Sequence, residues 1–338
     1  MTINHLLDDL ITAELADLSN SPWGITKANF EPEISARSKL FASLSPEVVQ
    51  LCQSLGFREP EKILVNLWTL WLPLAIQLGA IRKELGRTLI QGVLGGQGTG
   101  KSTLAIILRL ILGHLGYSVA NLSLDDLYLT YLERQKLQQQ DPRLLWRGPP
   151  GTHDVDLGLQ VLEQCLHYGD LNSTILMPRF DKSAFKGAGD RTLPEAIPHP
   201  DIVLFEGWFV GVQPVEASVF DHPPAPINNS ADRQFAKDIN QRLSAYLPLW
   251  SKLDRLIVLY PLDYRLSKQW RQEAEHRMIA AGKAGMSDEE IDRFVDYFWR
   301  SLHPELFIKP LINNPDLTDL VVEIESDHNF RKVYKHHL

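Results

Sequence analysis

One glycine-rich segment constrains the fold of this chain more than any other feature. The sequence GGQGTGKS at positions 95–102 matches the pattern GxxxxGK[ST] at every fixed position. An apolar run at 89–94 precedes it and a stretch with helical character follows at 104–112, which is the strand-loop-helix context that the pattern requires. Glycines let backbone N–H groups surround phosphate oxygens, and the N-terminus of the following helix adds positive potential. The segment therefore predicts a nucleotide phosphate site in an α/β fold.

Two side chains of this segment carry specific chemistry. We expect Lys101 to neutralise the β- and γ-phosphates and the hydroxyl of Ser102 to bind Mg²⁺. A glycine-rich turn with a chance Lys-Ser pair is the alternative, and both flanking patterns disfavour it. The dinucleotide pattern GxGxxG fails, because Lys101 stands where its last glycine is required. The residues expected to contact the nucleotide are Gly95, Gly96, Gln97, Gly98, Thr99, Gly100, Lys101, Ser102 and Thr103.

Short apolar runs recur along the chain from this point on. Continuous apolar runs indicate strands of a parallel sheet that is covered on both faces, since a half-exposed strand would alternate. The helical stretches between them indicate right-handed crossovers. The sequence thus predicts a three-layer α/β/α fold with a mostly parallel sheet. The runs are 89–94, 119–124, 174–177, 202–205, 256–260 and 320–324.

The first part of the chain has a different sequence pattern. Residues 1–86 have helical character, so we predict a helical N-terminal extension there and one α/β domain at 87–338. Within the extension, Ser45-Pro46 predicts the start of a helix that ends near Gly56.

An uncharged stretch at 63–81 is long enough to span a bilayer. It contains Asn66, Pro73 and Gln77, and it closely precedes a phosphate site that must work in water. A buried helix or pair of helices is therefore the favoured interpretation, with a membrane span as the alternative.

Charge and cysteine usage limit the partners and the compartment. The net charge of −8 and the pI near 5.8 exclude a general basic surface for nucleic acid. The two cysteines, Cys52 and Cys165, match no zinc or disulfide pattern, which indicates a reducing compartment. The acidic N-terminus has no signal- or transit-peptide pattern. We expect a cytoplasmic monomer or weak homodimer that binds neither nucleic acid nor a membrane.

Carboxylates follow two of the predicted strands. Asp125 and Asp126 come directly after the run at 119–124, and an acid there faces the crevice beside the phosphate site. Such an acid can accept the proton of an attacking hydroxyl. The alternative is that the pair caps the next helix, and one acid can cap while the other catalyses. Glu206 directly follows the run at 202–205 and is expected to hold Mg²⁺ or its waters.

Cations gather in two further places. The segment PRFDKSAFKGAGDR at 178–191 holds four cations without helical spacing, which suits a substrate carboxylate or a migrating phosphoryl group rather than a solvated helix face. Arg271 and Arg277 follow the run at 256–260 on a predicted helix that would act as a lid over the nucleotide. The alternative for the segment at 178–191 is a solvated loop, and the alternative for Arg271 and Arg277 is that they are ordinary surface residues.

His153 lies in a polar turn after the two aspartates. We expect it either to contact substrate or to have a structural role.

Taken together, several segments resemble the P-loop kinases grouped with phosphoribulokinase, uridine kinase and pantothenate kinase. Within that group the chain resembles the D-glycerate 3-kinase family of plants, fungi and cyanobacteria, from about Leu89 onward. The GTPase sequence NKxD and the transporter signature LSGGQ are absent. The segments that carry the resemblance are GGQGTGKST at 95–103, SLDDLY at 123–128, GTHD at 151–154, PRFDKSAFKGAGDR at 178–191, FEGW at 205–208 and WRQE at 270–273.

The resemblance implies a P-loop kinase domain at 87–338 with a helical lid at about 264–284. It implies ATP and Mg²⁺ as cofactors and phosphorylation of D-glycerate, a small-molecule substrate, to 3-phospho-D-glycerate. Another kinase of the group, acting on uridine, pantothenate or ribulose phosphate, and a nucleotide-dependent assembly or switch ATPase are the alternatives. The implied catalytic residues are Asp125, Lys101 and Arg271; the implied metal ligands are Ser102 and Glu206; the implied substrate contacts are Asp126, Tyr128, His153, Arg179, Lys186 and Arg191.

Overall fold

A computed structural model describes residues 3–167, 174–280, 282 and 285–335 of the chain. Part of the predicted lid, residues 281, 283 and 284, therefore lies outside the described residues. The strands are β1 (Leu89–Gly95), β2 (Val119–Ser123), β3 (Thr174–Met177), β4 (Phe180–Asp181), β5 (Asp190–Arg191), β6 (Glu195–Pro198), β7 (Ile202–Gly207), β8 (Arg255–Pro261), β9 (Leu320–Ile324) and β10 (Phe330–Tyr334).

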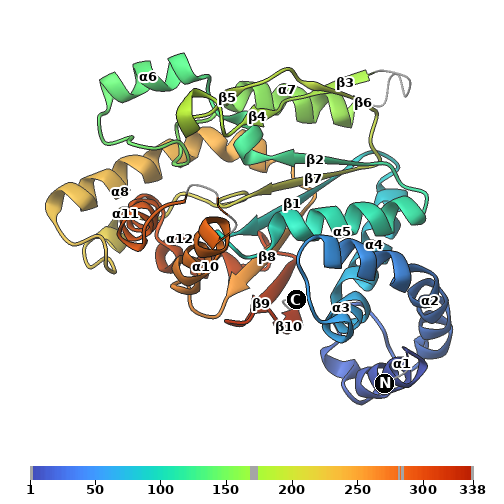
Figure 1. Ribbon diagram of the computed structural model, residues 1–338. Helices are drawn as coiled ribbons and strands as arrows, with labels where there is room; N and C mark the ends of the chain where they lie inside the picture. Colours follow the sequence, from blue (N-terminus) through green and yellow to red (C-terminus); the bar gives the residue numbers. More distant parts are fainter. Residues whose placement is uncertain (1–2, 168–173, 281, 283–284, 336–338) are drawn as a thin grey trace.

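The central sheet has the strand order β10-β9-β8-β1-β7-β2 and fans across the middle of Figure 1. Its pairs are parallel, except that the edge strand β10 runs antiparallel to β9. Successive residues of β1 enter opposite cores: Leu89 and Val93 belong to one apolar cluster, Ile90 and Leu94 to the other. A sheet buried on both faces requires such uninterrupted apolar strands, and the predicted three-layer fold with a mostly parallel sheet is confirmed.

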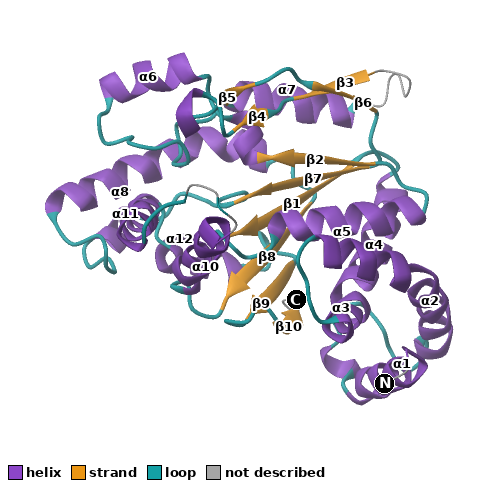
Figure 2. Ribbon diagram, viewed as in Figure 1, coloured by secondary structure: helices purple, strands orange, loops and turns teal. Residues whose placement is uncertain are grey.

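Helices cover both faces of this sheet (Figure 2). The cluster that holds Leu89 also takes side chains from the N-terminal helices and from the helix after the glycine-rich segment. The cluster that holds Ile90 takes side chains from later helices. The α-helices are α1 (Ile3–Ala16), α2 (Phe30–Ser54), α3 (Pro60–Asn66), α4 (Leu72–Leu85), α5 (Lys101–His114), α6 (Tyr131–Gln140), α7 (Val155–Leu166), α8 (Ser230–Leu243), α9 (Leu247–Trp250), α10 (Leu266–Ala280), α11 (Asp288–Ser301) and α12 (Pro304–Ile312).

The N-terminal helices gather at the lower right of Figure 1. Because they share one apolar core with the sheet, a division of the chain at residue 86 stays a prediction. The predicted helix start at Ser45-Pro46 is wrong, since Pro46 lies inside α2. The helix continues because Phe41, Leu44 and Val48 bury one face at helical spacing, which outweighs the backbone hydrogen bond that proline cannot donate.

The uncharged stretch lies in one continuous helical segment, Pro60–Leu85, which is long and apolar enough to cross a membrane by length and composition. In the protein, 67% of the residues in its most apolar window are buried. Trp68 packs edge-on against Phe41 and Trp71 packs against Phe330, so its largest side chains fill the core. The interpretation as a buried helix accounts for this packing.

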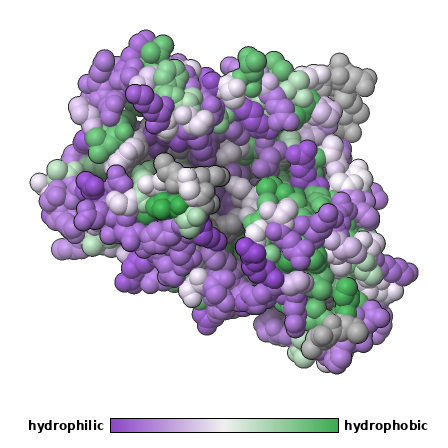
Figure 3. Space-filling view, viewed as in Figure 1, coloured by the Kyte–Doolittle hydropathy of each residue, from purple (hydrophilic) through white to green (hydrophobic). Residues whose placement is uncertain are grey.

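One predicted strand lies outside the central sheet. β3 pairs antiparallel with β6 in a separate two-stranded sheet, as β4 does with β5. In β3, Thr174 and Leu176 are exposed while Ile175 and Met177 are buried. Burial therefore alternates along this strand, although the amino-acid sequence shows no alternation of polar and apolar residues. The face shown in Figure 3 is mostly hydrophilic with scattered hydrophobic groups, since most apolar side chains lie in the two cores.

Candidate active site

A cleft of about 1350 Å³ opens at the carboxyl ends of β1, β2 and β7. Its walls are the glycine-rich loop after β1, the turn after β2, the end of β7 and the helices α10 and α11. Ligands of open α/β sheets bind at this end of the strands. The predicted site residues that line the cleft are Gln97, Gly98, Lys101, Ser102, Asp125, Tyr128, Glu206 and Arg271.

The glycine-rich loop has backbone conformations that only glycine adopts readily. Gly98 has φ +78° and Gly100 has φ +85°, both in the left-handed region. A Cβ atom on Gly98 would lie 2.7 Å from Cβ of Trp270, so α10 packs directly on the loop. The hydroxyl of Thr99 donates to the Gly96 carbonyl at 2.9 Å and closes the turn. The loop then enters α5, whose first turn carries Lys101, Ser102 and Thr103.

Lys101 reaches back over the loop, and its ammonium donates to the Gly96 carbonyl at 2.9 Å. Burial lowers the pKa of Lys101, while the nearby carboxylates of Glu206 and Asp125 oppose that shift. A buried ammonium beside the loop amides is suited to a polyphosphate, because its N–H groups can form charge-assisted hydrogen bonds with phosphate oxygens.

Ser102 and Glu206 come together as the sequence predicts. The Ser102 hydroxyl donates to Glu206 Oε1 at 3.4 Å, and Glu206 is 7% exposed. Glu206, the residue before the end of β7, lies opposite Val93 of β1 and Ser123 of β2, so the strand register brings it beside the loop. Hydroxyl and carboxylate oxygens suit Mg²⁺, which takes one or two protein ligands together with substrate phosphates. Within the described residues no group of three or more His, Cys, Asp or Glu side chains could hold a metal ion.

Asp125 points into the cleft from the short 3₁₀ turn Leu124–Leu127 that follows β2. Its Oδ2 lies 2.6 Å from the ammonium of Lys182, and the Tyr128 hydroxyl also hydrogen-bonds to it. Burial alone would raise the pKa of Asp125, but Lys182 and Tyr128 stabilise the ionised form and hold the pKa below its ordinary value. Asp125 is therefore a carboxylate at neutral pH and can accept a proton.

Asp126 faces away from the cleft and fastens the turn. Its oxygens accept hydrogen bonds from the backbone N–H of Ser123 at 3.1 Å and of Phe180 at 3.3 Å. Arg179 approaches the same carboxylate at 3.2 Å. This is the capping arrangement that the sequence left open for one member of the pair. Asp126 thus holds the turn that aims Asp125, and a contact of Asp126 with substrate stays a prediction.

The structure brings none of Arg179, Lys186 and Arg191 to the cleft. Arg179 donates to Glu195 at 2.7 and 2.9 Å, in addition to its pair with Asp126. Arg191 donates to the Tyr128 carbonyl at 2.9 Å and pairs with Asp154. Lys186 is exposed and borders a different pocket. These partners show that the two arginines anchor the basic loop, and contact of the three cations with substrate stays a prediction.

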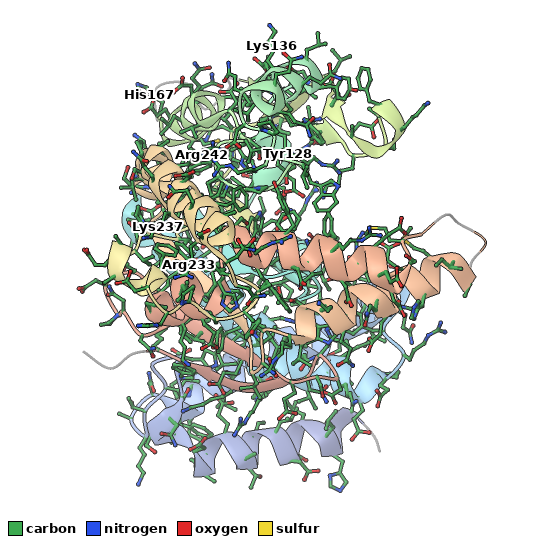
Figure 4. All side chains as sticks on the ribbon, turned by 90° about the vertical axis from the view of Figure 1, so that its left-hand side faces the viewer. Tyr128, Lys136, His167, Arg233, Lys237 and Arg242 are labelled. Carbon is green, nitrogen blue, oxygen red and sulfur yellow. The ribbon has the colours of Figure 1, made fainter. Side chains whose placement is uncertain are left out.

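His153 supports the site from behind. Its ring stacks on Tyr128 with centroids 4.5 Å apart, and its Nδ1 lies 2.9 Å from the Tyr246 hydroxyl. Burial lowers the pKa of His153 to about 3, so the ring is neutral. It does not line the cleft, and Tyr128 stands between it and Asp125. In Figure 4, Tyr128 lies in the upper part of the molecule, below Lys136 of α6 and to the right of Arg242 of α8.

Three cations that line the cleft were not singled out from the sequence: Arg147, Lys182 and Arg293. Lys182 belongs to the basic segment that was recognised, but only its contact with Asp125 distinguishes it from its neighbours. Arg293 projects from α11, whose capping box at Ser287 and Glu290 the sequence shows. Arg271 of α10 pairs with the buried Glu275 and lies 5.7 Å from the ring centroid of Phe294, which follows Arg293 in α11.

The strand-loop-helix unit, the carboxylates at the neighbouring strand ends and the cationic helix over them define a P-loop kinase. No family model matches the chain. The chain is 33% identical over 262 residues to Uncharacterized kinase mug58 of Schizosaccharomyces pombe, over 75% of this chain and 93% of that protein.

Two similar proteins carry a more specific name. The chain is 32% identical over 253 residues to the chloroplastic D-glycerate 3-kinase of Arabidopsis thaliana, over 71% of this chain. It spans about half the length of that relative, 53%. The solved structure of D-glycerate 3-kinase from Cryptococcus neoformans superimposes with a TM-score of 0.70 at 29% identity, over 78% of this chain and 96% of that one. The chain belongs to this family of kinases, which includes D-glycerate 3-kinase.

Proposed function

We propose that the chain transfers the γ-phosphoryl group of ATP to the 3-hydroxyl of D-glycerate. The observation that carries the proposal is the ionised Asp125, which shares one cleft with Lys101 and the glycine-rich loop. The names of the plant and the Cryptococcus relatives support D-glycerate as the acceptor.

The reaction follows from these positions. The loop amides and Lys101 would bind the phosphates, while Ser102 and Glu206 would hold Mg²⁺, which would neutralise charge on the phosphate oxygens. The acceptor hydroxyl attacks the γ-phosphorus, its proton passes to an oxygen of Asp125, and ADP leaves with the electrons of the broken P–O bond. Arg271 stabilises the negative charge of the transferring group from α10. Phosphoryl transfer needs positioning and charge neutralisation more than covalent catalysis, and these residues supply both.

The acceptor carboxylate has candidate cationic partners in the cleft. Lys182, Arg147 and Arg293 line it, and a planar carboxylate pairs well with guanidinium groups. A small hydroxy acid satisfies both requirements, since its carboxylate meets these cations while its hydroxyl meets Asp125. Uridine carries no such anionic group, so the lining favours a hydroxy acid over a nucleoside.

An acceptor panel tests this function. The full chain is incubated with Mg²⁺ and ATP and with D-glycerate, L-glycerate, uridine, pantothenate or ribulose 5-phosphate, and ADP release is followed. We expect turnover with D-glycerate far above the rate without acceptor. Turnover of another acceptor but not of D-glycerate would refute the substrate assignment. Slow ATP hydrolysis that no acceptor stimulates would instead identify a switch or assembly ATPase.

A further inference from the structure

Arg147 lines the cleft without a carboxylate partner of its own. Two other cations of the cleft are already paired, Lys182 with Asp125 at 2.6 Å and Arg271 with Glu275. Arg147 is partly buried and forms no ion pair with any residue that the structure describes. Burial of a charge costs free energy unless the charge is paired. Arg147 is therefore available to pair with an anion that enters the cleft.

One side of the Arg147 guanidinium is fixed to the protein. Its Nη1 donates to the Gly187 carbonyl at 2.7 Å and to the Ala188 carbonyl at 3.0 Å, both in the basic segment. Its Nε and Nη2 have no hydrogen-bond partner among the described residues. These two nitrogens form an edge that can bind a carboxylate through two parallel hydrogen bonds. The protein thus holds Arg147 by one nitrogen and leaves a carboxylate-binding edge unpaired.

Two aromatic rings flank this guanidinium beside the proposed base. The guanidinium carbon of Arg147 lies 5.9 Å from the ring centroid of Tyr128 and 5.5 Å from that of Phe180. The Tyr128 hydroxyl hydrogen-bonds to Asp125. In a short hydroxy acid the carboxylate lies close to the reacting hydroxyl, so a site for such an acid needs a cation near the base. Arg147 meets this requirement, since Tyr128 contacts both Arg147 and Asp125.

The residues on either side of Arg147 fix its backbone against α11. Trp146 packs edge-on against Tyr297 with ring centroids 5.0 Å apart. Gly148 has φ +136°, and a Cβ atom at this position would collide with the Phe298 ring. A side chain that is held in place before the ligand arrives lowers the entropic cost of binding.

Two further cations line the cleft without an ion pair to a described residue, Arg293 and Lys101. Lys101 stands on the glycine-rich loop, where the phosphates would bind. Arg293 is exposed, and its Nε donates at 3.3 Å to the carbonyl of Glu289 in its own helix. An exposed arginine loses more side-chain freedom when a ligand orders it. Arg147 is therefore the best prepared of these cations to bind a carboxylate.

We propose that Arg147 selects a hydroxy acid as the acceptor, by binding its carboxylate through Nε and Nη2 while the hydroxyl meets Asp125. The inference rests on the proposed use of D-glycerate and assigns the recognition of its carboxylate to one residue. An uncharged polyol offers this edge of Arg147 no anion and is disfavoured for that reason.

Two acceptors that differ in charge test this inference. D-Glycerate carries the carboxylate, whereas D-glyceramide has an uncharged amide in its place and keeps both hydroxyls. At saturating Mg²⁺-ATP, kcat/KM for each acceptor is measured with the unmodified full chain, with Arg147→Ala and with Arg147→Lys. The control is Lys136→Ala, which removes an exposed cation of α6 outside the cleft, labelled in Figure 4.

We expect the unmodified chain to prefer D-glycerate over D-glyceramide by about ten- to hundredfold, the range for a hydrogen bond to a charged group. Arg147→Ala should remove this preference by lowering kcat/KM for D-glycerate, with little change for D-glyceramide or in KM for ATP. Arg147→Lys should also lose activity with D-glycerate alone, because an ammonium cannot form the paired contact, and it keeps the test valid if Arg147→Ala does not fold. Lys136→Ala should behave as the unmodified chain.

The opposite results separate this inference from the proposed function. Equal loss with both acceptors in the Arg147 variants, full activity of either variant with D-glycerate, or no preference in the unmodified chain would overturn the inference and leave the proposed function standing. Failure of the unmodified chain to phosphorylate D-glycerate would refute the proposed function itself.

Discussion

Replacing Asp125 by asparagine removes the proposed proton acceptor while keeping the size of the side chain. A positioned general base contributes about 10²–10⁴-fold to a rate, which corresponds to about 2.7–5.4 kcal/mol of the activation barrier. We therefore expect kcat of Asp125→Asn to fall by about 10²–10⁴-fold. KM for ATP should change little, because Asp125 contacts Lys182 and Tyr128 rather than the glycine-rich loop. Steady-state kinetics with D-glycerate and ATP varied in turn separates the two parameters.

Asp126→Asn is the matched control, since it changes the adjacent carboxylate in the same way. Asp126 pairs with Arg179 and accepts two backbone N–H groups, so we expect the unfolding free energy to fall by about 1–3 kcal/mol. The kcat of folded Asp126→Asn should fall far less than that of Asp125→Asn, because Asp126 acts only through the turn that aims Asp125. A hundredfold loss of kcat in folded Asp126→Asn, together with near-normal kcat in Asp125→Asn, would refute the assignment of the base.

Three further substitutions separate catalytic from supporting residues. Lys182→Met removes the cation that lowers the pKa of Asp125 and leaves the burial that raises it. The acid limb of the pH profile of kcat/KM should therefore move to higher pH, and an unmoved limb would contradict the ion pair between Lys182 and Asp125. Arg179→Ala should lower the unfolding free energy measured in urea by about 1–3 kcal/mol and leave KM for D-glycerate nearly unchanged. A large rise in KM for D-glycerate alone would instead show that Arg179 contacts the substrate. Gly98→Ala places a Cβ atom 2.7 Å from Trp270 at a left-handed φ and should lower kcat/KM for ATP by about 10–100-fold, and unchanged kinetics would show that the loop does not hold the phosphates.

The phosphate site could be predicted because its residues are consecutive in the chain. Eight positions, one preceding strand and one following helix define the loop, and Ser102 needs only the end of the next parallel strand to meet Glu206. The sheet was predictable for a related reason, since strands buried on both faces have continuous apolar sequences. The prediction that β3 belongs to the central sheet was wrong, because none of its four residues is charged and the sequence therefore does not show that one face of the strand is exposed.

The roles of neighbouring charged residues could not be predicted in the same way. Asp125 and Asp126 are adjacent in sequence, and only the 3₁₀ turn after β2 decides which one enters the cleft. In the basic segment the partners decide: Glu195 and Asp126 hold Arg179, Asp154 holds Arg191, and Lys182 is left to face Asp125. The two arginines lie between 16 and 53 residues from these partners, and one sequence without a fold does not reveal them.

A second pocket of about 340 Å³ beside the glycine-rich loop is lined by residues that are still farther apart in the sequence. Arg58 and Asn329 border the same hollow although almost the whole kinase fold separates them in sequence. The helical pattern of the first 86 residues predicted helices, but it contained no signal for the face of the sheet on which they pack. The packing of Trp71 on Phe330 joins the two regions.

A structure of the chain with Mg²⁺, a non-hydrolysable ATP analogue and D-glycerate tests the central claim most directly. The account predicts the 3-hydroxyl of D-glycerate within about 2.6–3.2 Å of an Asp125 oxygen and in line with the γ-phosphorus. D-Glycerate bound outside the cleft, or a 3-hydroxyl beyond the reach of Asp125, would contradict it.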